Sequence, residues 1–424
     1  MRVLFCAYDR AGHVTTGPNA WLQRLIPDLL SCGLDIITHF FYNDAENECP
    51  TVGYFKENNI PYVSSSIGCF PYTEDQVREL LGVISRNDIS VVVANLVIPA
   101  FYTAKYLKRF NIPVIPVLHS DEPHTRGVIT QFINNVQGNI NCSVSVSELI
   151  NSYVNITNKS KHKVIPCGTP ESNIKAKVFQ NELKIIYAGR IEVEQKQILY
   201  LADAFIECST CCEKTSFSIY GNGRYQDELK ALLATSCDHK VVYKGAVSPS
   251  EIQNVMSQHH VFTLMSDYEG MPVALMEAMA CGVVPVCLAE NSGVNEIIID
   301  GFNGLIVKDR GRDYRAKLRL LLEDPELWSR LSNNAIKTIE ERYSSKVTHQ
   351  KWVDLLNSYR QNEVEKISTP KTIELDGPPL LYSDIRKPSI FIQVKHKWSR
   401  YWLQIRLAIR PRARLREVLK IFIK

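Results

Sequence analysis

The feature that most constrains the fold is an alternation of short apolar runs with helical patterns, repeated almost from end to end. In the first part of the chain we predict strands at 3–7, 35–41, 90–97, 114–118 and 142–146, and helices at 19–31, 73–86, 101–110 and 128–136. In the second part we predict strands at 183–188, 216–220, 241–244, 261–265, 284–287 and 304–307, and helices at 197–207, 226–235, 251–259 and from 272 onward. Strands that alternate with helices in this way form a parallel sheet with both faces covered, so the predicted fold class is α/β.

A polar gap at 170–181 divides this alternation into two similar halves. Because 424 residues are too many for one hydrophobic core, we predict two tandem Rossmann-like, doubly wound domains that face each other across a cleft. Ligands of such sheets bind at the carboxyl ends of the strands. The predicted boundaries are 1–172 for the first domain, 183–345 for the second, 346–360 for a closing helix that packs back on the first domain, 361–390 for a linker and 391–424 for a basic helical tail.

The composition, 45% hydrophobic and 22% charged, is that of a soluble globular protein. The N-terminal residues lack the apolar core of a signal peptide, and the longest apolar stretch, 271–289, contains Glu277 and two prolines. We therefore expect neither secretion nor a transmembrane helix, and twelve reduced cysteines in the cytoplasm. Cys208 and Cys211 have the spacing of a zinc or redox pair, but no second such pair follows, so we expect a loop after a helix there.

The net charge of +4 conceals a strong asymmetry along the chain. Residues 386–424 contain twelve Lys or Arg and one Glu, a net +11, which leaves −7 on the rest. In this segment Trp398, Trp402, Ile405 and Ile409 recur at helical spacing among arginines. A basic helix of this kind suits an anionic membrane surface, which would make the protein a peripheral membrane protein. Docking on the protein's own acidic domains is an alternative, and nucleic acid is a less favoured partner.

The stretch DYEGMPVALMEAMACGVVPV, at 267–286, places two glutamates around the start of a predicted helix. Proline is well tolerated at the first helical position, so the helix is predicted to begin at Pro272 and Glu269 belongs to the loop before it. Glu277 then lies about one and a half turns into the helix. Its neighbours are all apolar, which disfavours a solvated face, and a buried carboxylate needs a partner. The alternative is that Glu269 only caps the helix and Glu277 faces solvent.

The start of this helix is suited to an anion. Gly270 allows a ligand to approach the backbone closely. The N–H groups of Met271, Val273 and Ala274 point out of a helix N-terminus, whose partial positive charge favours phosphate. We therefore predict a site for a phosphorylated ligand, flanked by two carboxylates that accept hydrogen bonds from hydroxyl groups.

The run EGMP at 269–272, Glu277 and the run ACGVVPV at 280–286 resemble the E-x7-E signature of glycosyltransferase family 4. Members of this family are retaining, use nucleotide sugars and have the two-domain GT-B architecture. The resemblance extends from residue 1 to about residue 359, and it makes 1–172 the acceptor domain and 183–345 the donor domain.

Other segments of the second domain match the family in the same order. YAGR at 187–190, which ends in Arg190, and the downstream Lys196 resemble the family's cationic pair, although Gln197 stands where the family usually has Gly. IYGNG at 219–223 resembles the family's second glycine turn, with Gly221 and Gly223. The resemblance implies that both cations bind the donor diphosphate and stabilise it as it leaves.

In the first domain, His119 at the end of a predicted strand resembles the family's acceptor-side histidine. Such a histidine can hydrogen-bond the donor sugar and orient the incoming hydroxyl, whereas the competing interpretation is a satisfied core histidine. GHVTTGPN at 12–19 fills the first strand-to-helix loop, where the family has paired glycines beside the phosphates. Pro18 replaces one expected Gly, so both Gly12 and Gly17 are candidates for donor binding.

The resemblance implies transfer of a sugar from a nucleoside diphosphate sugar to an acceptor hydroxyl with retention of configuration. It implies catalytic roles for Glu269, His119, Arg190 and Lys196, with Glu269 on the sugar hydroxyls. It places Glu277 on the ribose, and Gly270, Met271, Pro272 and Val273 beside the phosphates. No metal or cofactor is expected, and the acceptor is expected to be a glycan or lipid-linked saccharide in glycan, polysaccharide or glycolipid biosynthesis.

Three alternatives remain open at this point. A nucleotide-sugar epimerase or a phosphorylase of the same architecture would use similar donor contacts. A catalytically idle scaffold at the membrane surface would depend on the basic tail instead. A glycosidase is disfavoured because its two carboxyl groups lie roughly 5–9.5 Å apart, whereas eight residues of one continuous helix span about 12 Å.

Overall fold

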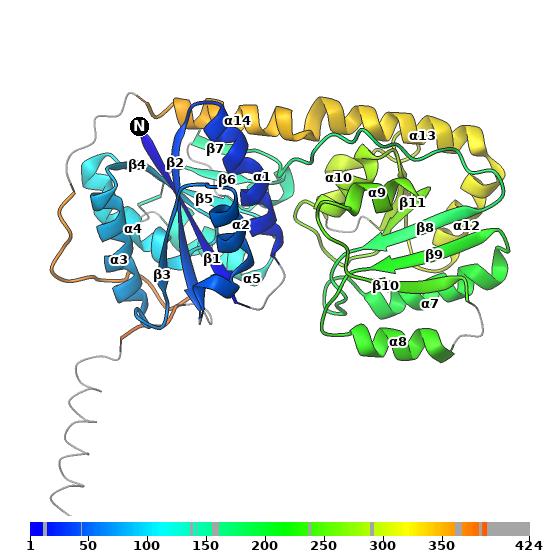
Figure 1. Ribbon diagram of the computed structural model, residues 1–424, viewed down its shortest axis with the longest axis horizontal. Helices are drawn as coiled ribbons and strands as arrows, with labels where there is room; N and C mark the ends of the chain where they lie inside the picture. Colours follow the sequence, from blue (N-terminus) through cyan, green and yellow to red (C-terminus); the bar gives the residue numbers. More distant parts are fainter. Residues whose placement is uncertain are drawn as a thin grey trace, which may run out of the picture.

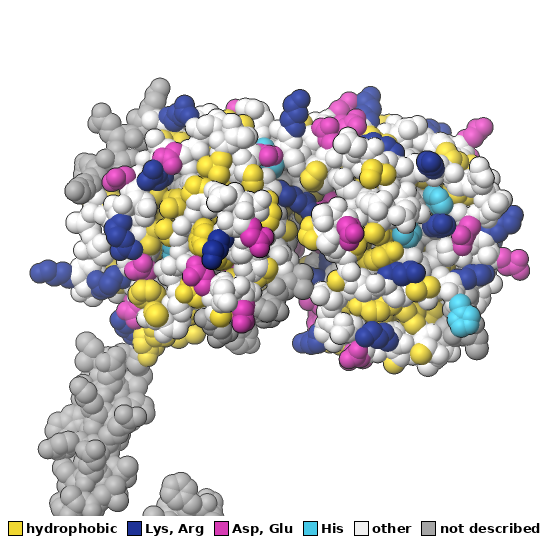
Figure 2. All heavy atoms as spheres, viewed as in Figure 1, with side chains coloured by type: hydrophobic (Ala, Val, Ile, Leu, Met, Phe, Trp, Pro, Cys, Tyr) yellow, Lys and Arg dark blue, Asp and Glu magenta, His cyan; other side chains and the backbone are white. Residues whose placement is uncertain are grey.

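The computed structural model describes residues 1–11, 15–43, 45–135, 139–140, 142–154, 161–235, 239–288, 292–360, 367–380 and 384–387. Two parallel sheets, each covered by helices, lie side by side and are bridged along one edge by a long helical element (Figure 1). The prediction of two tandem doubly wound α/β domains is therefore confirmed. The two lobes are separated by a notch in Figure 2. The predicted tail at 391–424 lies outside the described residues.

The described strands of the first domain form one parallel sheet in the order β3-β2-β1-β4-β5-β6-β7. They are β1 (Arg2–Arg10), β2 (Asp35–Asn43), β3 (Tyr62–Ser66), β4 (Ile89–Ala94), β5 (Val114–Leu118), β6 (Ser143–Ser145) and β7 (His162–Val164). The helices are α1 (Gly17–Ser31), α2 (Pro50–Glu57), α3 (Thr73–Arg86), α4 (Ile98–Leu107), α5 (Pro123–Val128) and α6 (Glu148–Ser152), with a π-helical turn at Ile129–Ile133. The strand order reverses between β1 and β4, which is where doubly wound sheets bind ligands.

The second domain repeats this plan with the order β10-β9-β8-β11-β12-β13. Its strands are β8 (Leu183–Ala188), β9 (Thr215–Tyr220), β10 (Val241–Gly245), β11 (Val261–Leu264), β12 (Val284–Leu288) and β13 (Leu305–Val307). Its helices are α7 (Ile198–Cys211), α8 (Gln226–Thr235), α9 (Ile252–Ser257), α10 (Val273–Ala280), α11 (Val294–Ile297), α12 (Arg312–Glu323) and α13 (Pro325–Thr338). Strands β11 and β12 are wholly buried because helices cover both faces of the sheet, which explains their unbroken apolar sequences.

The last helix, α14 (Ser345–Asn357), returns to the first domain and packs on α1 (Figure 1). The rings of Trp352 and Trp21 lie 5.5 Å apart, and the Nδ1 atom of His349 lies 2.5 Å from a carboxylate oxygen of Asp28. Ser344 caps this helix by accepting a hydrogen bond from the Val347 N–H group. The end of the second domain is thereby fixed against the helix that follows β1.

The chain beyond α14 runs along the first domain. We call residues 367–380 and 384–387 the C-terminal strap; this segment lies within the predicted linker and has neither helix nor strand. The Arg78 guanidinium donates hydrogen bonds to the carbonyl oxygens of Pro370 and Lys371, both at 2.9 Å. The Tyr102 hydroxyl donates to the buried Asp384 carboxylate at 2.7 Å. A free linker would make no such contacts, so the strap is part of the first domain's surface.

Several smaller predictions differ from the structure: α2 and α6 were not predicted, and in place of the helix predicted at 128–136 the chain forms α5 and the π-helical turn. The Cys208–Cys211 pair lies within α7 and not in a loop, because the helix continues four residues past the predicted end at 207. The short strands β3 and β7 do not appear among the predicted strands. None of the described helices is both long and apolar enough to cross a membrane.

Candidate active site

Loops at the carboxyl edges of the two sheets bring the predicted site residues together. Arg190 and Lys196 lie between β8 and α7, and Glu269 lies between β11 and α10. His119 comes directly after β5 in the opposite domain. The two edges are in direct contact, since the backbone of Gly270 packs on the backbone of His119.

Glu269 and Lys196 form a buried ion pair. The Lys196 ammonium lies 2.5 Å from one Glu269 oxygen, and the exposed fractions of the two side chains are only 13% and 7%. Gln195 supports the pair by donating to the Tyr268 carbonyl oxygen at 2.9 Å. The Glu269 carbonyl oxygen also accepts from the Gly293 N–H group at 3.0 Å, which fixes the loop. A carboxylate held in this way accepts hydrogen bonds at a defined position.

Glu277 has a partner from the other domain. The Arg24 guanidinium, on α1, lies 2.5 Å from a Glu277 carboxylate oxygen, and only 10% of the Glu277 side chain is exposed. The other side of α10 is core, so this carboxylate faces the first domain. The two glutamates of the predicted signature are therefore both buried, and each is neutralised by one cation.

Arg24 was not among the predicted site residues. Its sequence context shows only that it shares a helical face with Asp28, four residues on. Its partner is 253 residues away in the chain, so only the packing of the two domains brings them together.

Arg190 does not contact Glu269. Its guanidinium donates to Glu192 at 2.8 Å and to Gln195 at 2.5 Å, and 56% of its side chain is exposed. Gln195 in turn bonds the loop that carries Glu269. Arg190 thus lies at the rim of the Lys196–Glu269 pair, itself paired with Glu192 and more than half exposed.

The residue after Lys196 explains one departure from the family pattern. Gln197 has φ of 52° and ψ of 40°, the left-handed conformation that glycine adopts without strain. Its side chain amide donates to the Asp267 carboxylate, which tethers it to the loop before Glu269. The backbone shape that favours glycine is therefore retained with a different residue.

Gly221 and Gly223 serve the packing of this loop. Gly221 has φ of +140°, and a Cβ atom there would overlap the Gly189 carbonyl oxygen. A Cβ atom at Gly223 would overlap the backbone of Ile191, lying 2.8 Å from its nitrogen. Both glycines let the turn after β9 pack against the segment that carries Arg190.

The helix N-termini differ slightly from the prediction. Pro272 is the N-cap of α10 and Val273 is its first residue, a shift of one position from the predicted start. Met271 is buried beside it. In the first domain α1 begins at Gly17, whose missing side chain leaves open space, and Thr16 caps it by accepting from the Asn19 N–H group. Gly12 lies outside the described residues.

His119 is half-buried, with a buried Nε2 atom, and its imidazole is neutral. Burial lowers its pKa from 6.5 to about 3. Its ring packs edge-on against Trp21 with centroids 5.0 Å apart, and its Nδ1 atom lies 3.8 Å from the Cys167 sulfur. Within the described residues its Nε2 atom has no hydrogen-bond partner, although it is buried. A ligand hydroxyl would satisfy this atom.

The low pKa of His119 predicts a pH effect on stability. The unfolded chain takes up a proton below pH 6.5 that the folded protein rejects until about pH 3, so stability is lost as the pH falls. One such group lowers the free energy of unfolding by about 2 kcal/mol between pH 6.5 and pH 5. We expect urea unfolding of wild type and of His119→Asn to show a smaller acid loss in the variant. An equal loss in both proteins would contradict a neutral His119 imidazole.

Gly270 gives a second prediction. A Cβ atom at this position would overlap the His119 carbonyl oxygen and lie 3.0 Å from the Ser120 Cα atom, both backbone atoms of the other domain. Gly270→Ala is therefore expected to lower the free energy of unfolding by about 1–3 kcal/mol, measured by urea denaturation, and to weaken ligand binding between the domains. Gly53→Ala is the matched control, because a Cβ atom there meets nothing within 4 Å. Equal stability of the two variants would show that the domains do not pack this closely.

Other contacts hold the two edges in register. The Glu296 carboxylate, from α11, accepts hydrogen bonds from the backbone N–H groups of Glu148 and Leu149 at 2.8 and 2.9 Å.

Among the described residues, no group of three or more His, Cys, Asp or Glu side chains is placed to hold a metal ion.

Comparison with known proteins finds a family match over the second domain. Residues 169–338 match the family described as Glycosyl transferases group 1. We call residues 169–338, which match this family model, the group 1 domain. It contains Arg190, Lys196, Glu269 and Glu277, whereas Arg24 and the other candidates of the first domain lie outside the match.

Two curated relatives are similar to part of this chain. The alpha-D-kanosaminyltransferase of Streptomyces kanamyceticus is 30% identical over 162 residues, 38% of this chain and 42% of the relative. A Campylobacter jejuni N,N'-diacetylbacillosaminyl-diphospho-undecaprenol alpha-1,3-N-acetylgalactosaminyltransferase is 29% identical over 194 residues, 43% of this chain and 50% of the relative. The chain thus matches half or less of the length of each.

The fold as a whole is also similar to solved structures. The crystal structure of Anabaena HepE in complex with UDP superposes with a TM-score of 0.69 at 16% identity, covering 84% of this chain and all of that one. This likeness extends over both domains. The group 1 domain and the first domain together therefore have the GT-B fold.

Proposed function

We propose that this protein is a retaining glycosyltransferase of family 4, which transfers a sugar from a nucleoside diphosphate sugar to a hydroxyl group of a glycan or lipid-linked acceptor. The observation that carries the proposal is the pair of buried carboxylates between the domains, each matched to one cation. The group 1 match and the names of the relatives, which are glycosyltransferases, support the reaction class. The UDP in the Anabaena structure supports a nucleoside diphosphate as the leaving group.

The donor would bind across the two edges. Its diphosphate would meet the N–H groups at the start of α10. Arg190 and Lys196 would add positive charge from the neighbouring loop. Glu277 would accept hydrogen bonds from the ribose diol, and this requires the Arg24 guanidinium to move from its present position on that carboxylate.

In the chemical step, negative charge would develop on the departing diphosphate, beside Lys196 and Arg190. The anomeric carbon exchanges its bond to the diphosphate oxygen for a bond to the acceptor oxygen, the diphosphate leaves with the electron pair, and the acceptor hydroxyl gives its proton to the departing diphosphate. The negative charge that grows on the diphosphate is stabilised by Lys196 and Arg190 in a site largely closed to water. Glu269 would hold the sugar hydroxyls, and His119 would accept a hydrogen bond at its unpaired Nε2 atom.

The reaction is tested by product analysis. The purified protein is incubated with UDP-, GDP- and ADP-sugars, with and without a lipid-linked saccharide acceptor, and nucleoside diphosphate and products are quantified. We expect release that depends on the acceptor and, by NMR, the same anomeric configuration in donor and product. An altered donor sugar without an acceptor would establish an epimerase, and dependence on inorganic phosphate would establish a phosphorylase.

We also propose that residues 391–424 bind an anionic membrane, which would bring lipid-linked acceptors to the first domain. The strap supports this, because Lys387 pairs with Asp75 at 2.5 Å and fixes the start of the basic segment to the first domain. Co-sedimentation of the full chain with phosphatidylglycerol vesicles is the measurement. Equal recovery with neutral phosphatidylcholine vesicles would contradict an electrostatic anchor.

A further inference from the structure

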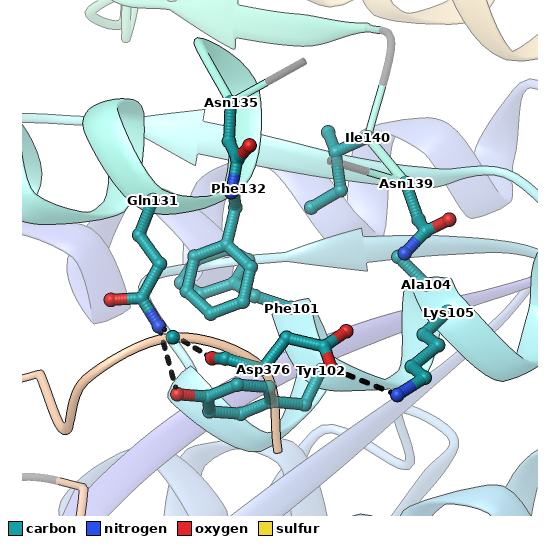
Figure 3. Close-up of a pocket in the computed structure, with 11 residues that line it drawn as sticks. Phe101, Tyr102, Ala104, Lys105, Gln131, Phe132, Asn135, Asn139, Ile140 and Asp376 are labelled. Atoms are coloured by element: carbon teal, nitrogen blue, oxygen red, sulfur yellow. Dashed lines mark hydrogen bonds and ion pairs between the residues drawn. The ribbon is translucent and has the colours of Figure 1, made fainter. Parts of the chain in front are cut away.

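The strap closes a cavity on the first domain that the proposed reaction does not use. The cavity measures about 510 Å³ and lies between α4, the π-helical turn at Ile129–Ile133 and the strap residues Asp376 and Gly377 (Figure 3). Its volume is in the range of small-molecule sites, roughly 300–1,000 Å³. Gly377 has φ of +73°, and a Cβ atom there would lie 3.0 Å from the Gln131 amide, so the strap is closely fitted at this point.

The cavity is separate from the candidate active site. Helix α4 begins at Ile98, after a short loop at 95–97 that follows β4 at the carboxyl edge of the sheet, and Lys105 lies two turns along the helix. Seven residues of helix cover about 10 Å. None of the described residues that line the cavity is among the candidate active-site residues, so the cavity lies on the flank of the first domain, apart from that site.

One wall is aromatic. The rings of Tyr102 and Phe132 lie 4.9 Å apart in an edge-to-face arrangement, and those of Phe101 and Phe132 lie 5.5 Å apart. The Phe132 ring occupies the centre of the view in Figure 3. Phe132 comes from the π-helical turn, a feature that recurs at functional sites. Rigid ring surfaces of this kind pack on the apolar faces of a ligand.

The rim is polar without net positive charge. The Lys105 ammonium lies 2.8 Å from Asp376 and 3.5 Å from Glu374, so its charge is neutralised. The Gln131 amide donates to the Tyr102 hydroxyl at 3.1 Å and to the Asp376 carbonyl oxygen at 3.0 Å (Figure 3). Two further carboxamides, Asn135 and Asn139, complete the lining.

This lining selects against several ligand classes. A phosphate or nucleotide would face the Asp376 carboxylate without an unpaired cation among the described lining residues. A metal ion would find a single carboxylate, that of Asp376, in the lining. The carboxamides and the neutralised ion pair carry both donors and acceptors, as a ligand rich in hydroxyl groups requires, whereas the Tyr102 hydroxyl is already bonded to Asp384 and Gln131. Beside an aromatic wall, this combination matches a sugar ring, whose C–H face is apolar and whose edge is polar.

We propose that this cavity binds a neutral saccharide unit of the acceptor, away from the residue that receives the new sugar. The inference rests on the proposed function for the identity of its ligand, but the binding itself needs neither donor nor catalysis. A site on the flank of the first domain would hold an extended acceptor while its end reaches the interdomain site. The strap supplies one wall, so the segment between α14 and the basic tail becomes part of acceptor recognition.

The test uses neutral trisaccharides as probes. Maltotriose, cellotriose and N,N',N''-triacetylchitotriose are titrated into the full chain, and binding is followed by saturation-transfer NMR and calorimetry without nucleotide. Gln131→Met removes the carboxamide at nearly constant volume, and Ala104→Leu fills the cavity from α4. We expect at least one trisaccharide to bind, with Kd raised about tenfold or more in each variant that remains folded by thermal denaturation.

Glu277→Gln separates this inference from the proposed function. Because Glu277 lies at the interdomain site, trisaccharide binding is expected to be unchanged in this variant whether or not the protein transfers sugar. If Glu277→Gln loses trisaccharide binding while Gln131→Met and Ala104→Leu keep it, the saccharide binds in the interdomain site and the proposal is overturned. Failure of all three trisaccharides to bind folded wild type would also overturn it.

Discussion

Replacing Lys196 by alanine is expected to lower kcat for sugar transfer by about 100- to 1,000-fold, the usual cost of removing one group that stabilises a developing negative charge. The ammonium lies 2.5 Å from Glu269 and only 13% of the side chain is exposed, so water does not readily replace its charge. Nucleoside diphosphate binding is expected to change much less, because Arg190 and the start of α10 remain. The measurement is acceptor-dependent release of nucleoside diphosphate at saturating donor.

This variant also leaves Glu269 as an unpaired buried charge. Loss of one partner of a buried ion pair destabilises proteins by about 3–5 kcal/mol, so Lys196→Ala must be shown to be folded at the assay temperature. The double variant Lys196→Ala with Glu269→Gln is the matched control, since it removes both charges. We expect it to recover stability but not activity. Recovery of activity together with stability would show that Lys196 has only a structural role.

The second large effect is expected at Glu277. Glu277→Gln keeps the shape of the side chain but removes its charge, and hydrogen bonds to charged groups are worth about 1.5–3 kcal/mol. We therefore expect the Kd for the preferred nucleoside diphosphate to rise about 10- to 100-fold. Calorimetric titration with UDP, GDP and ADP measures this directly.

Arg24→Ala is the matched control for Glu277→Gln. The guanidinium occupies the Glu277 carboxylate across the domain boundary, so its removal takes away a competitor of the ribose. Nucleoside diphosphate binding by Arg24→Ala is expected to be at least as tight as in wild type. If both variants weaken binding equally, the ion pair between the domains, and not a ribose contact, is the role of Glu277.

The fold was largely predictable because its strands are buried on both faces. Strands such as β11 and β12 therefore consist of short apolar runs, and these runs can be recognised in the sequence. Strand β3, with the sequence YVSSS, lies at the edge of its sheet and is only partly buried, so its composition gives no such signal. Strand β7 has three residues, of which none is fully buried.

The candidate site was predictable where its residues are close in sequence. Glu269, Gly270 and Glu277 belong to one strand–loop–helix unit, and the apolar surroundings of Glu277 indicated a buried carboxylate that needs a partner. The partner itself, Arg24, comes from the other domain, and no periodicity reveals a contact between residues so far apart.

Two further features could not be predicted from the sequence, because they depend on backbone geometry. Gln197 has a positive φ, which is uncommon for residues other than glycine and cannot be predicted from the residue type. The sequence therefore did not show why Gln can stand where the family usually has Gly. The strap has no helical or strand periodicity, and its fixed course depends on hydrogen bonds from α3 and α4, such as that of Tyr102 to Asp384. Gly12 and the basic tail lie outside the described residues, so their roles remain predictions.

The central claim is that a nucleoside diphosphate binds between the two domains, against Glu277 and the start of α10. The most direct test is a thermal-shift comparison of wild type and Glu277→Gln with UDP, GDP and ADP. A ligand at about 100 times its Kd stabilises a folded protein by about 2.7 kcal/mol, a shift of several degrees in Tm. We predict such a shift for one diphosphate in wild type and its loss or weakening in Glu277→Gln. No shift with any of the three in folded wild-type protein would contradict the claim.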